Sequence, residues 1–285
     1  MNKSIFTLVP VLVLLMVTGL PLTSAAGEGG EDLFPIVSFG LGIDYVTGDY
    51  GSETRTDFVS IPLYFDYYPS ERLDFELIVP LVYQSNQTGD LATLPYRTPH
   101  GSTVLMAAVG PGGGTTRTFT DSDSSANGLG DITLTAGLIL LREKERHPQL
   151  RASLYLKAPT ADEEKGLGTG EWDWGPGLGV SQWLGNWHLF AEGRYVFQGD
   201  SDLYATRNYL SYNGGLGRQF TPTFYGALQA RGATESAEGV SDYLEGRAKF
   251  IWRFLPDNAL EGYLGRGITD ASPDFSAGLA LFHDF

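Results

Sequence analysis

Hydrophobic and polar residues alternate over many short runs of this chain, and the final run shows the pattern most plainly. In residues 275–285 the odd positions hold Phe, Ala, Leu, Leu, His and Phe, and the even positions hold Ser, Gly, Ala, Phe and Asp. A period of two is typical of a β-strand whose two faces meet different surroundings. A strand at the edge of a sheet exposes unpaired N–H and C=O groups. We therefore expect this last strand to pair with the first one and close the sheet into a barrel.

The same alternation predicts about twelve strands. They are expected at residues 37–45, 59–67, 73–84, 131–141, 150–157, 172–182, 187–197, 209–220, 224–231, 244–254, 259–268 and 275–285. Short turns, such as Gly185-Asn186, alternate with connections that are mostly longer. An even number of strands, with short turns at one end and long loops at the other, is typical of an antiparallel up-and-down transmembrane β-barrel. We therefore predict an all-β fold and assign residues 36–285 to the barrel.

The direction of the apolar face separates a membrane barrel from a soluble one. A soluble β-sandwich or ligand-holding barrel shows the same alternation but turns its apolar face inward. In a closed barrel of this size, that choice would leave Glu245, Arg247, Lys249 and Arg253 outside and fill a wide interior with aliphatic side chains. Aromatic residues also gather toward both ends of the strands, as two membrane–water interfaces favour. We therefore expect the apolar face to contact lipid and the charged face to line a lumen.

Residues 86–127 break the alternation. This stretch is rich in Thr, Ser, Gly and Pro, and it holds one apolar piece at residues 104–109. A loop of this length in a compact domain is usually functional. We predict that it folds over the mouth of the barrel or into the lumen and narrows the passage. The candidate gate residues are Val104, Leu105, Met106 and Val109.

Composition and targeting signals agree with export to a membrane. Lys3 precedes an apolar stretch that ends near Leu20, and Ser24-Ala25-Ala26 is a small-residue cleavage site. Residues 1–26 are therefore predicted to be a secretory signal and residues 27–35 a periplasmic leader; an uncleaved anchor is disfavoured because the apolar run is short. Cysteine is absent, which excludes disulfides and thiolate metal sites. The net charge of −15 argues against nucleic acid as a partner.

Charged residues on the predicted inner face are the candidates for lining a pathway. They are Asp44, Asp66, Asp74, Glu76, Arg231, Glu245, Arg247, Lys249 and Arg253. Two interpretations remain open. Mixed charges can pair across strands and stiffen the barrel. Alternatively, the acidic residues of the first three strands face the basic residues of the ninth and tenth, and the resulting transverse field selects a solute.

No arrangement of residues indicates catalysis. Outer-membrane phospholipases also have twelve strands and use a Ser–His pair, but the four histidines of this chain lie in no such signature. They are His100, His147, His188 and His283. No His–Cys or His-Glu-x-x-His pattern indicates a metal site, and no cofactor is expected. We therefore predict that the protein is not an enzyme.

The middle of the chain resembles a known family. The matching motifs are Gly128-Leu129-Gly130-Asp131, Lys157-Ala158-Pro159-Thr160-Ala161-Asp162, Gly166-Leu167-Gly168-Thr169-Gly170 and Gly199-Asp200. Their succession is similar to that of the transporters of the phenol-degradation meta-pathway family, which are outer-membrane barrels. The resemblance implies uptake or export of small aromatic or hydrophobic compounds. The glycines allow tight bends where strands leave the membrane, so we interpret these motifs as architectural.

The chain ends on Phe285, and an aromatic C-terminus resembles the terminal strand of bacterial outer-membrane proteins. That resemblance implies the barrel assembly machinery as a partner, besides outer-membrane lipid and a small-molecule solute. Barrels of about eight strands are filled and those of about sixteen hold open channels, so twelve strands predict a narrow or gated lumen. We expect a porin-like channel in the outer membrane of a Gram-negative bacterium. The alternatives are a plugged structural or surface-binding barrel and, less favoured, a lipid hydrolase.

Overall fold

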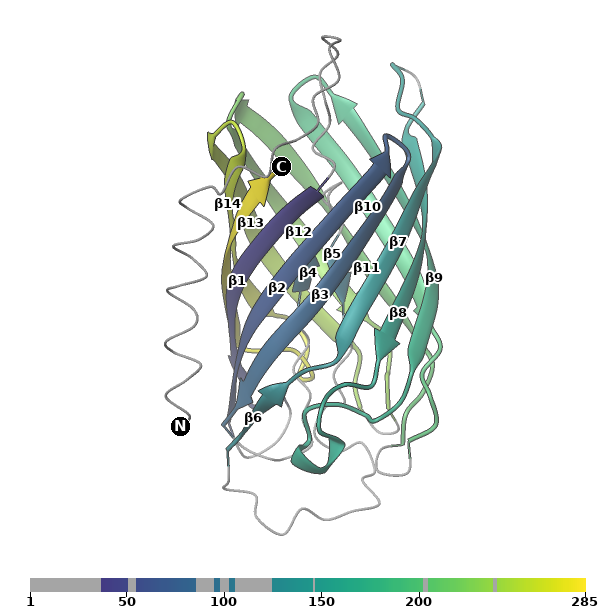
Figure 1. The fold of residues 1–285 in the computed structure, drawn as a ribbon, viewed down its shortest axis with the longest axis vertical. Helices are drawn as coiled ribbons and strands as arrows, with labels where there is room; N and C mark the ends of the chain where they lie inside the picture. Colours follow the sequence, from purple (N-terminus) through teal and green to yellow (C-terminus); the bar gives the residue numbers. More distant parts are fainter. Residues whose placement is uncertain are drawn as a thin grey trace.

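The computed structural model describes residues 37–50, 55–85, 95–97, 103–105, 125–145, 147–201, 205–237 and 240–285; the predicted signal and leader lie outside these residues. An antiparallel sheet curves into a barrel (Figure 1). Its strands are β1 (Val37–Gly48), β2 (Thr56–Ser70), β3 (Leu73–Gln84), β6 (Ala126–Leu129), β7 (Ile132–Leu141), β8 (Gln149–Ala158), β9 (Asp173–Leu184), β10 (Trp187–Val196), β11 (Tyr209–Thr221), β12 (Phe224–Ala233), β13 (Tyr243–Leu255), β14 (Asn258–Gly267) and β15 (Phe275–Asp284). The other elements are the short strands β4 (Pro95–Arg97) and β5 (Thr103–Leu105) and the 3-10 helix η1 (Glu163–Lys165). None of the described residues forms a helix that is long and apolar enough to span a membrane.

The last strand closes the sheet on the first one. β15 pairs antiparallel with β1, from Ser38 opposite Asp284 to Thr47 opposite Phe275. Beyond the end of β15, the Phe285 N–H donates to the Val37 carbonyl at 2.9 Å. Because β1 also pairs with β2 and β15 with β14, neither terminal strand has a free edge. The predicted closure is confirmed.

The short strand β6 continues the line of β7. Both pair with β3, β6 along Leu81–Gln84 and β7 along Leu73–Ile78. Gly130 lies between them, and its N–H donates to the Pro80 carbonyl at 2.8 Å. β6 and β7 together form one strand of the barrel wall, so the closed barrel has twelve, as the alternation predicted.

Successive residues of the strands face outward and inward, also as predicted. The outward side chains of Ile43, Leu154 and Leu228 are 52%, 52% and 69% exposed, whereas inward Asp66 and Arg231 are 1% and 0% exposed. An apolar outer surface suits hydrocarbon, where an unpaired polar group would be costly. The chain therefore folds as a transmembrane β-barrel whose charged face points inward.

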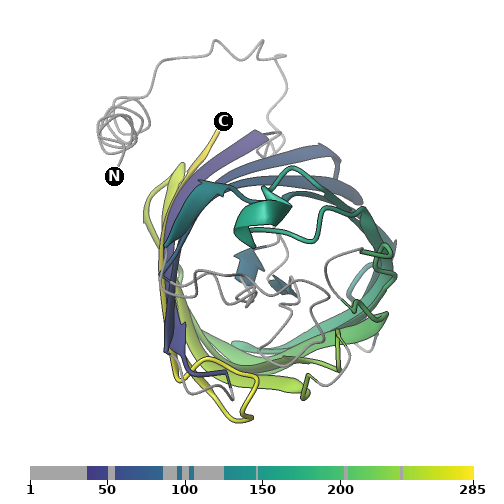
Figure 2. The same ribbon diagram turned by 90° about the horizontal axis from the view of Figure 1, so that it is seen from below.

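The stretch that breaks the alternation places a hairpin, β4–β5, inside the barrel. Figure 2 looks along the barrel and shows β4 and β5 within the ring of strands; β5 also contacts β11. Val104 and Leu105, two of the candidate gate residues, lie in β5. The other two, Met106 and Val109, lie outside the described residues.

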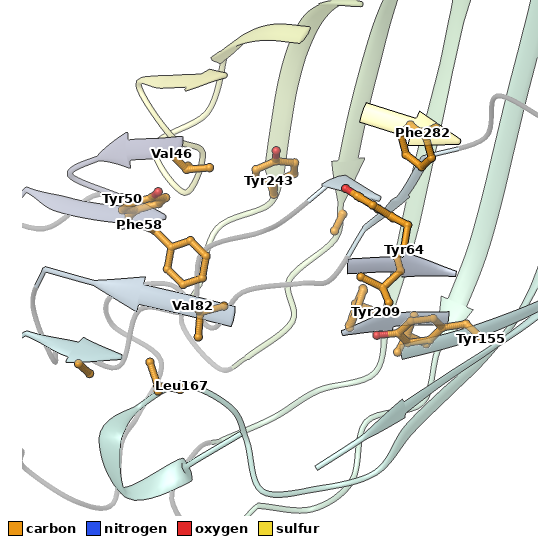
Figure 3. Packing of buried hydrophobic residues seen from close by; sticks show 14 of the residues in the cluster. Val46, Tyr50, Phe58, Tyr64, Val82, Tyr155, Leu167, Tyr209, Tyr243 and Phe282 are labelled. Carbon is orange, nitrogen blue, oxygen red and sulfur yellow. The ribbon is translucent and has the colours of Figure 1, made fainter. Parts of the chain in front are cut away.

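Aromatic side chains pack on the inner face of the wall. The rings of Tyr64 and Phe282 approach each other with centroids 5.2 Å apart (Figure 3). Phe282 lies over Gly40 of β1, where a Cβ atom would be 2.3 Å from the ring, so this close approach requires glycine. The inner face is therefore aromatic as well as charged.

Candidate solute pathway in the barrel lumen

The two rims of the barrel differ. One rim, here called the short-turn rim, carries the turns at residues 71–72, 185–186, 222–223 and 256–257. The opposite rim, here called the long-loop rim, carries the connections from β1 to β2, β3 to β6, β8 to β9, β10 to β11, β12 to β13 and β14 to β15. Any pathway through the lumen runs between these rims.

The four acidic candidates lie on the inner face of β1, β2 and β3. Asp44, Asp66, Asp74 and Glu76 are all 5% exposed or less. Asp44 accepts a hydrogen bond from the Tyr263 hydroxyl at 2.8 Å. Asp66 and Glu76 are directly opposite each other on β2 and β3.

Asp74 forms a buried ion pair with Arg151 of β8. The Arg151 Nε donates to Asp74 Oδ1 at 3.1 Å, and its Nη2 bonds the other carboxylate oxygen. The arginine reaches across Gly137 of β7, where a Cβ atom would overlap the guanidinium. This pair joins β3 to β8 on the inner face, across the strand that separates them.

Glu245 is the centre of a second cluster, which joins β12, β13 and β15. Arg247 Nη2 is 2.9 Å from a Glu245 oxygen, and Arg231 Nε is 3.6 Å from the same oxygen. The hydroxyls of Tyr243 and Ser276 donate to the same carboxylate. All three charged side chains of this Glu245 cluster are 1% exposed or less.

The remaining two basic candidates lie nearer the short-turn rim. Lys249 forms an ion pair with Glu261 of β14, and both side chains are 10% exposed or less. Arg253 lies at the rim itself, where its side chain is 44% exposed and its Nη1 is 2.9 Å from Asp284 Oδ2. The basic residues of β12 and β13 therefore do not form a separate ladder, because each one contacts a carboxylate on β13, β14 or β15.

Lys157, at the long-loop rim, lies between two carboxylates. Its Nζ is 2.7 Å from Asp173 and 3.3 Å from Asp131, and it donates to the Thr169 hydroxyl at 2.8 Å. Asp131 also accepts the N–H of Ala161 at 3.1 Å. These four side chains, here called the Lys157 cluster, fasten the loop between β8 and β9 to three strand ends.

The motifs that carry the family resemblance meet at the Lys157 cluster. Asp131 ends the first motif, Lys157 begins the second, and Thr169 belongs to the third. Gly199, from the fourth, donates its N–H to Asp173 at 3.2 Å. Gly170 has a φ of +75°, a conformation that favours glycine. The sequence interpretation recognised the bends but missed the ion pairs that hold them together.

A group of rings lines the inner face near the short-turn rim. The rings of Trp183 and His188 stack with centroids 4.5 Å apart and planes 12° apart. His188 Nδ1 is 3.1 Å from the Tyr225 hydroxyl, and the His188 ring is 5.4 Å from that of Phe190. These four residues, here called the aromatic group, come from β9, β10 and β12. All four side chains face inward. Trp183 therefore lines the lumen and is not one of the aromatic residues that face lipid near this rim.

The other histidines lie apart from one another. His283 Nδ1 is 3.2 Å from the Asn258 side-chain oxygen, and His147 lies in the turn between β7 and β8. His100 is outside the described residues. Within the described ranges, no group of three or more His, Asp or Glu residues is arranged to hold a metal ion.

Residues 54–285 match the model of a protein family described as "Putative MetA-pathway of phenol degradation". The chain belongs to this family. The match covers most of the barrel and includes every motif that carried the resemblance. Among curated proteins, none matches the chain in sequence.

A solved outer-membrane channel shares the fold. A crystal structure of an outer membrane channel from Pseudomonas putida F1 is 17% identical and covers 92% of this chain and 100% of that chain, with a TM-score of 0.63. The KdgM porin (7% identity, 86% and 99% coverage, TM-score 0.48) and the CymD monoaromatic hydrocarbon channel (9%, 89% and 89%, 0.47) are less similar. Identities this low show the fold alone. Together with the apolar outer surface, that fold places the protein in the outer membrane.

Proposed function

We propose that the barrel is a channel that passes small aromatic or hydrophobic solutes across the outer membrane through a narrow lumen. One observation carries the proposal. Nine carboxylates and five basic side chains are buried inside the described part of the wall. Buried ion pairs are costly to desolvate, and apolar residues of similar size fill a sealed interior equally well. An interior that keeps these charges therefore supports a hydrated passage, and the family description supports aromatic compounds as the solute.

The direct test is transport by the purified protein. We expect step-wise ionic currents in planar bilayers and swelling of liposomes in a panel of sugars, amino acids and aromatic compounds. The rate of swelling should be greatest for small aromatic compounds. Absence of both current and swelling in correctly folded protein would refute the channel.

We further propose that the hairpin β4–β5 narrows the passage. Its placement among the barrel strands supports this role for Val104 and Leu105. Replacing residues 95–105 by a short Gly-Ser linker should raise the single-channel conductance. An unchanged conductance would mean that the hairpin does not border the ion path.

The paired charges offer a second test of the passage. In the double variant Arg247→Gln, Lys249→Gln, the carboxylates of Glu245 and Glu261 lose close cationic partners. Because the wall then gains net negative charge, the reversal potential in a salt gradient should move toward cation selectivity. An unchanged reversal potential would place these side chains away from the ion path.

A plugged barrel that serves a structural or surface-binding role is the second candidate. The observation in its favour is the same hairpin, since β4 and β5 occupy space within the ring of strands. The two candidates differ in conductance, which a plugged barrel lacks. If the linker variant conducts and the unaltered protein does not, the plugged barrel is the better description.

A further inference from the structure

The aromatic group brings four rings together at one place on the inner face, and none of its members is a carboxylate, a lysine or an arginine. Trp183, His188, Phe190 and Tyr225 all face inward at the short-turn rim. Elsewhere on that face, arginines and lysines lie against carboxylates. A neutral aromatic surface among ion pairs is a candidate binding surface for another ring, because stacked and edge-to-face rings attract each other.

The packing leaves one member of the group uncovered. His188 is 7% exposed because it lies against Trp183 and Tyr225. The ring of Trp183 stacks on that of His188, and Trp183 is 38% exposed although its side chain faces inward. The His188 ring is therefore packed within the wall, whereas part of the Trp183 ring stays accessible. A surface on which another ring stacks requires this arrangement.

Glycines on β11 let two of these rings lie against the backbone of the wall. A Cβ atom at Gly217 would be 1.9 Å from the Tyr225 hydroxyl oxygen, and one at Gly215 would be 2.8 Å from the Phe190 ring. Both glycines face inward, between β10 and β12. Larger residues there would push the rings toward the lumen axis. The two rings thus cover the inner face of β11, which makes the wall aromatic from β10 to β12.

The charge of the inner face narrows the class of ligand. Among the described residues that are buried there, nine carboxylates exceed five basic side chains. The base nearest to the aromatic group along the wall is Lys249, which lies on β13 opposite Ala227, two residues from Tyr225, and is paired with Glu261. A carboxylate on the ligand would meet this excess of negative charge among the described residues. An uncharged ring would meet no such repulsion.

We propose that Trp183, supported by His188, Phe190 and Tyr225, is a stacking site for uncharged planar aromatic solutes at the short-turn end of the lumen. This inference rests on the proposed channel function, which supplies the solute to that position. A single aromatic pair is worth about two- to tenfold in affinity. The site therefore slows a passing ring without trapping it.

The test compares benzyl alcohol with cyclohexylmethanol, which have the same hydroxymethyl group on a planar and on a saturated ring. Binding to the detergent-solubilised barrel is followed by saturation-transfer NMR, and residence in the channel by the duration of current blocks. The variant is Trp183→Leu, with Trp183→Phe as the conservative rescue. The matched control is Trp187→Leu, because Trp187 lies at the same rim but faces lipid and is 45% exposed.

The unaltered barrel, Trp187→Leu and Trp183→Phe should all bind benzyl alcohol about two- to tenfold more tightly than cyclohexylmethanol. Trp183→Leu should lose this preference, and benzoate should bind more weakly than benzyl alcohol. Equal binding of both alcohols to the unaltered barrel, or a preference that survives in Trp183→Leu, would overturn the site. A barrel that conducts no ions but still shows the preference by NMR would refute the channel and retain the site.

Discussion

Replacing Lys157 by methionine should weaken the barrel more than any other loss of a single charge at the long-loop rim. Methionine keeps the apolar stem of lysine and removes only the ammonium group. In the folded protein that group is 2.7 Å from Asp173 and 3.3 Å from Asp131, with its side chain 7% exposed. The substitution therefore leaves two buried carboxylates close together without their shared cation.

The expected cost follows from this burial. Removing one partner of a buried ion pair costs about 3–5 kcal/mol, because the remaining charge stays desolvated and unpaired. Lys157→Met should lose about that much free energy of unfolding. Adding Asp131→Asn to Lys157→Met removes one of the two stranded charges, so the double variant should be more stable than Lys157→Met alone.

The assay is urea unfolding of the barrel in lipid vesicles, followed by tryptophan fluorescence. The matched control is Lys165→Met in the adjoining loop. Lys165 Nζ is 2.6 Å from Asp162, but its side chain is 51% exposed, and exposed pairs are worth about 0–1 kcal/mol. If Lys157→Met unfolds at the same urea concentration as Lys165→Met, the Lys157 cluster does not hold the rim together.

Three further predictions concern other parts of the barrel. Leu228→Arg, on the lipid face midway along β12, should cost about 2–4 kcal/mol in the same urea assay, and a neutral result would mean that this face does not contact hydrocarbon. Gly185→Ala and Gly170→Ala should each cost about 1–2 kcal/mol through their φ of +61° and +75°, because the carboxylate that a Cβ at Gly170 would overlap ends the flexible, exposed side chain of Glu163 and can move away; no loss of stability in either variant would contradict this reason. The hydrogen bond from Lys165 lowers the pKa of Asp162, so that pair stabilises the folded loop at neutral pH and is lost on acidification; NMR titration should show the Asp162 pKa rising in Lys165→Met, and no rise would mean that the pair is absent in solution.

The alternation revealed strand positions because lipid and lumen impose opposite demands on successive residues. The expected strand at 73–84 matches β3, and the expected strand at 187–197 exceeds β10 by one residue. β2 extends beyond its expected range of 59–67 to Thr56–Ser70, because pairing continues past the apolar zone that the pattern marks. Glycines weaken the interior of a strand, yet β11 forms at the expected 209–220, and rings from its neighbours cover Gly215 and Gly217.

The partner of each charged side chain was harder to predict. The alternation shows which face of the sheet a side chain lies on, but not how far along the barrel axis it lies. The hypothesis of opposed ladders placed Arg231 and Arg247 across the lumen from the acids of β1 to β3. The structure pairs both with Glu245 instead. Residues i and i+2 of a strand share a face, so Glu245 and Arg247 were already neighbours in the sequence. That spacing also occurs in Glu192 and Arg194, which form an ion pair. It was the sequence signal for pairing within one strand rather than across the lumen.

Local pairing bears on how such a lumen would discriminate between solutes. Two separated ladders of opposite charge would create a field across the whole passage, whereas an ion pair with its charges about 3 Å apart acts as a dipole whose field falls off steeply with distance. Arg151 with Asp74, Arg247 with Glu245, and Lys249 with Glu261 are all pairs of this short kind. A small uncharged molecule would pass them with little gain or loss, and the channel proposed here would then select among uncharged solutes by width and by ring stacking.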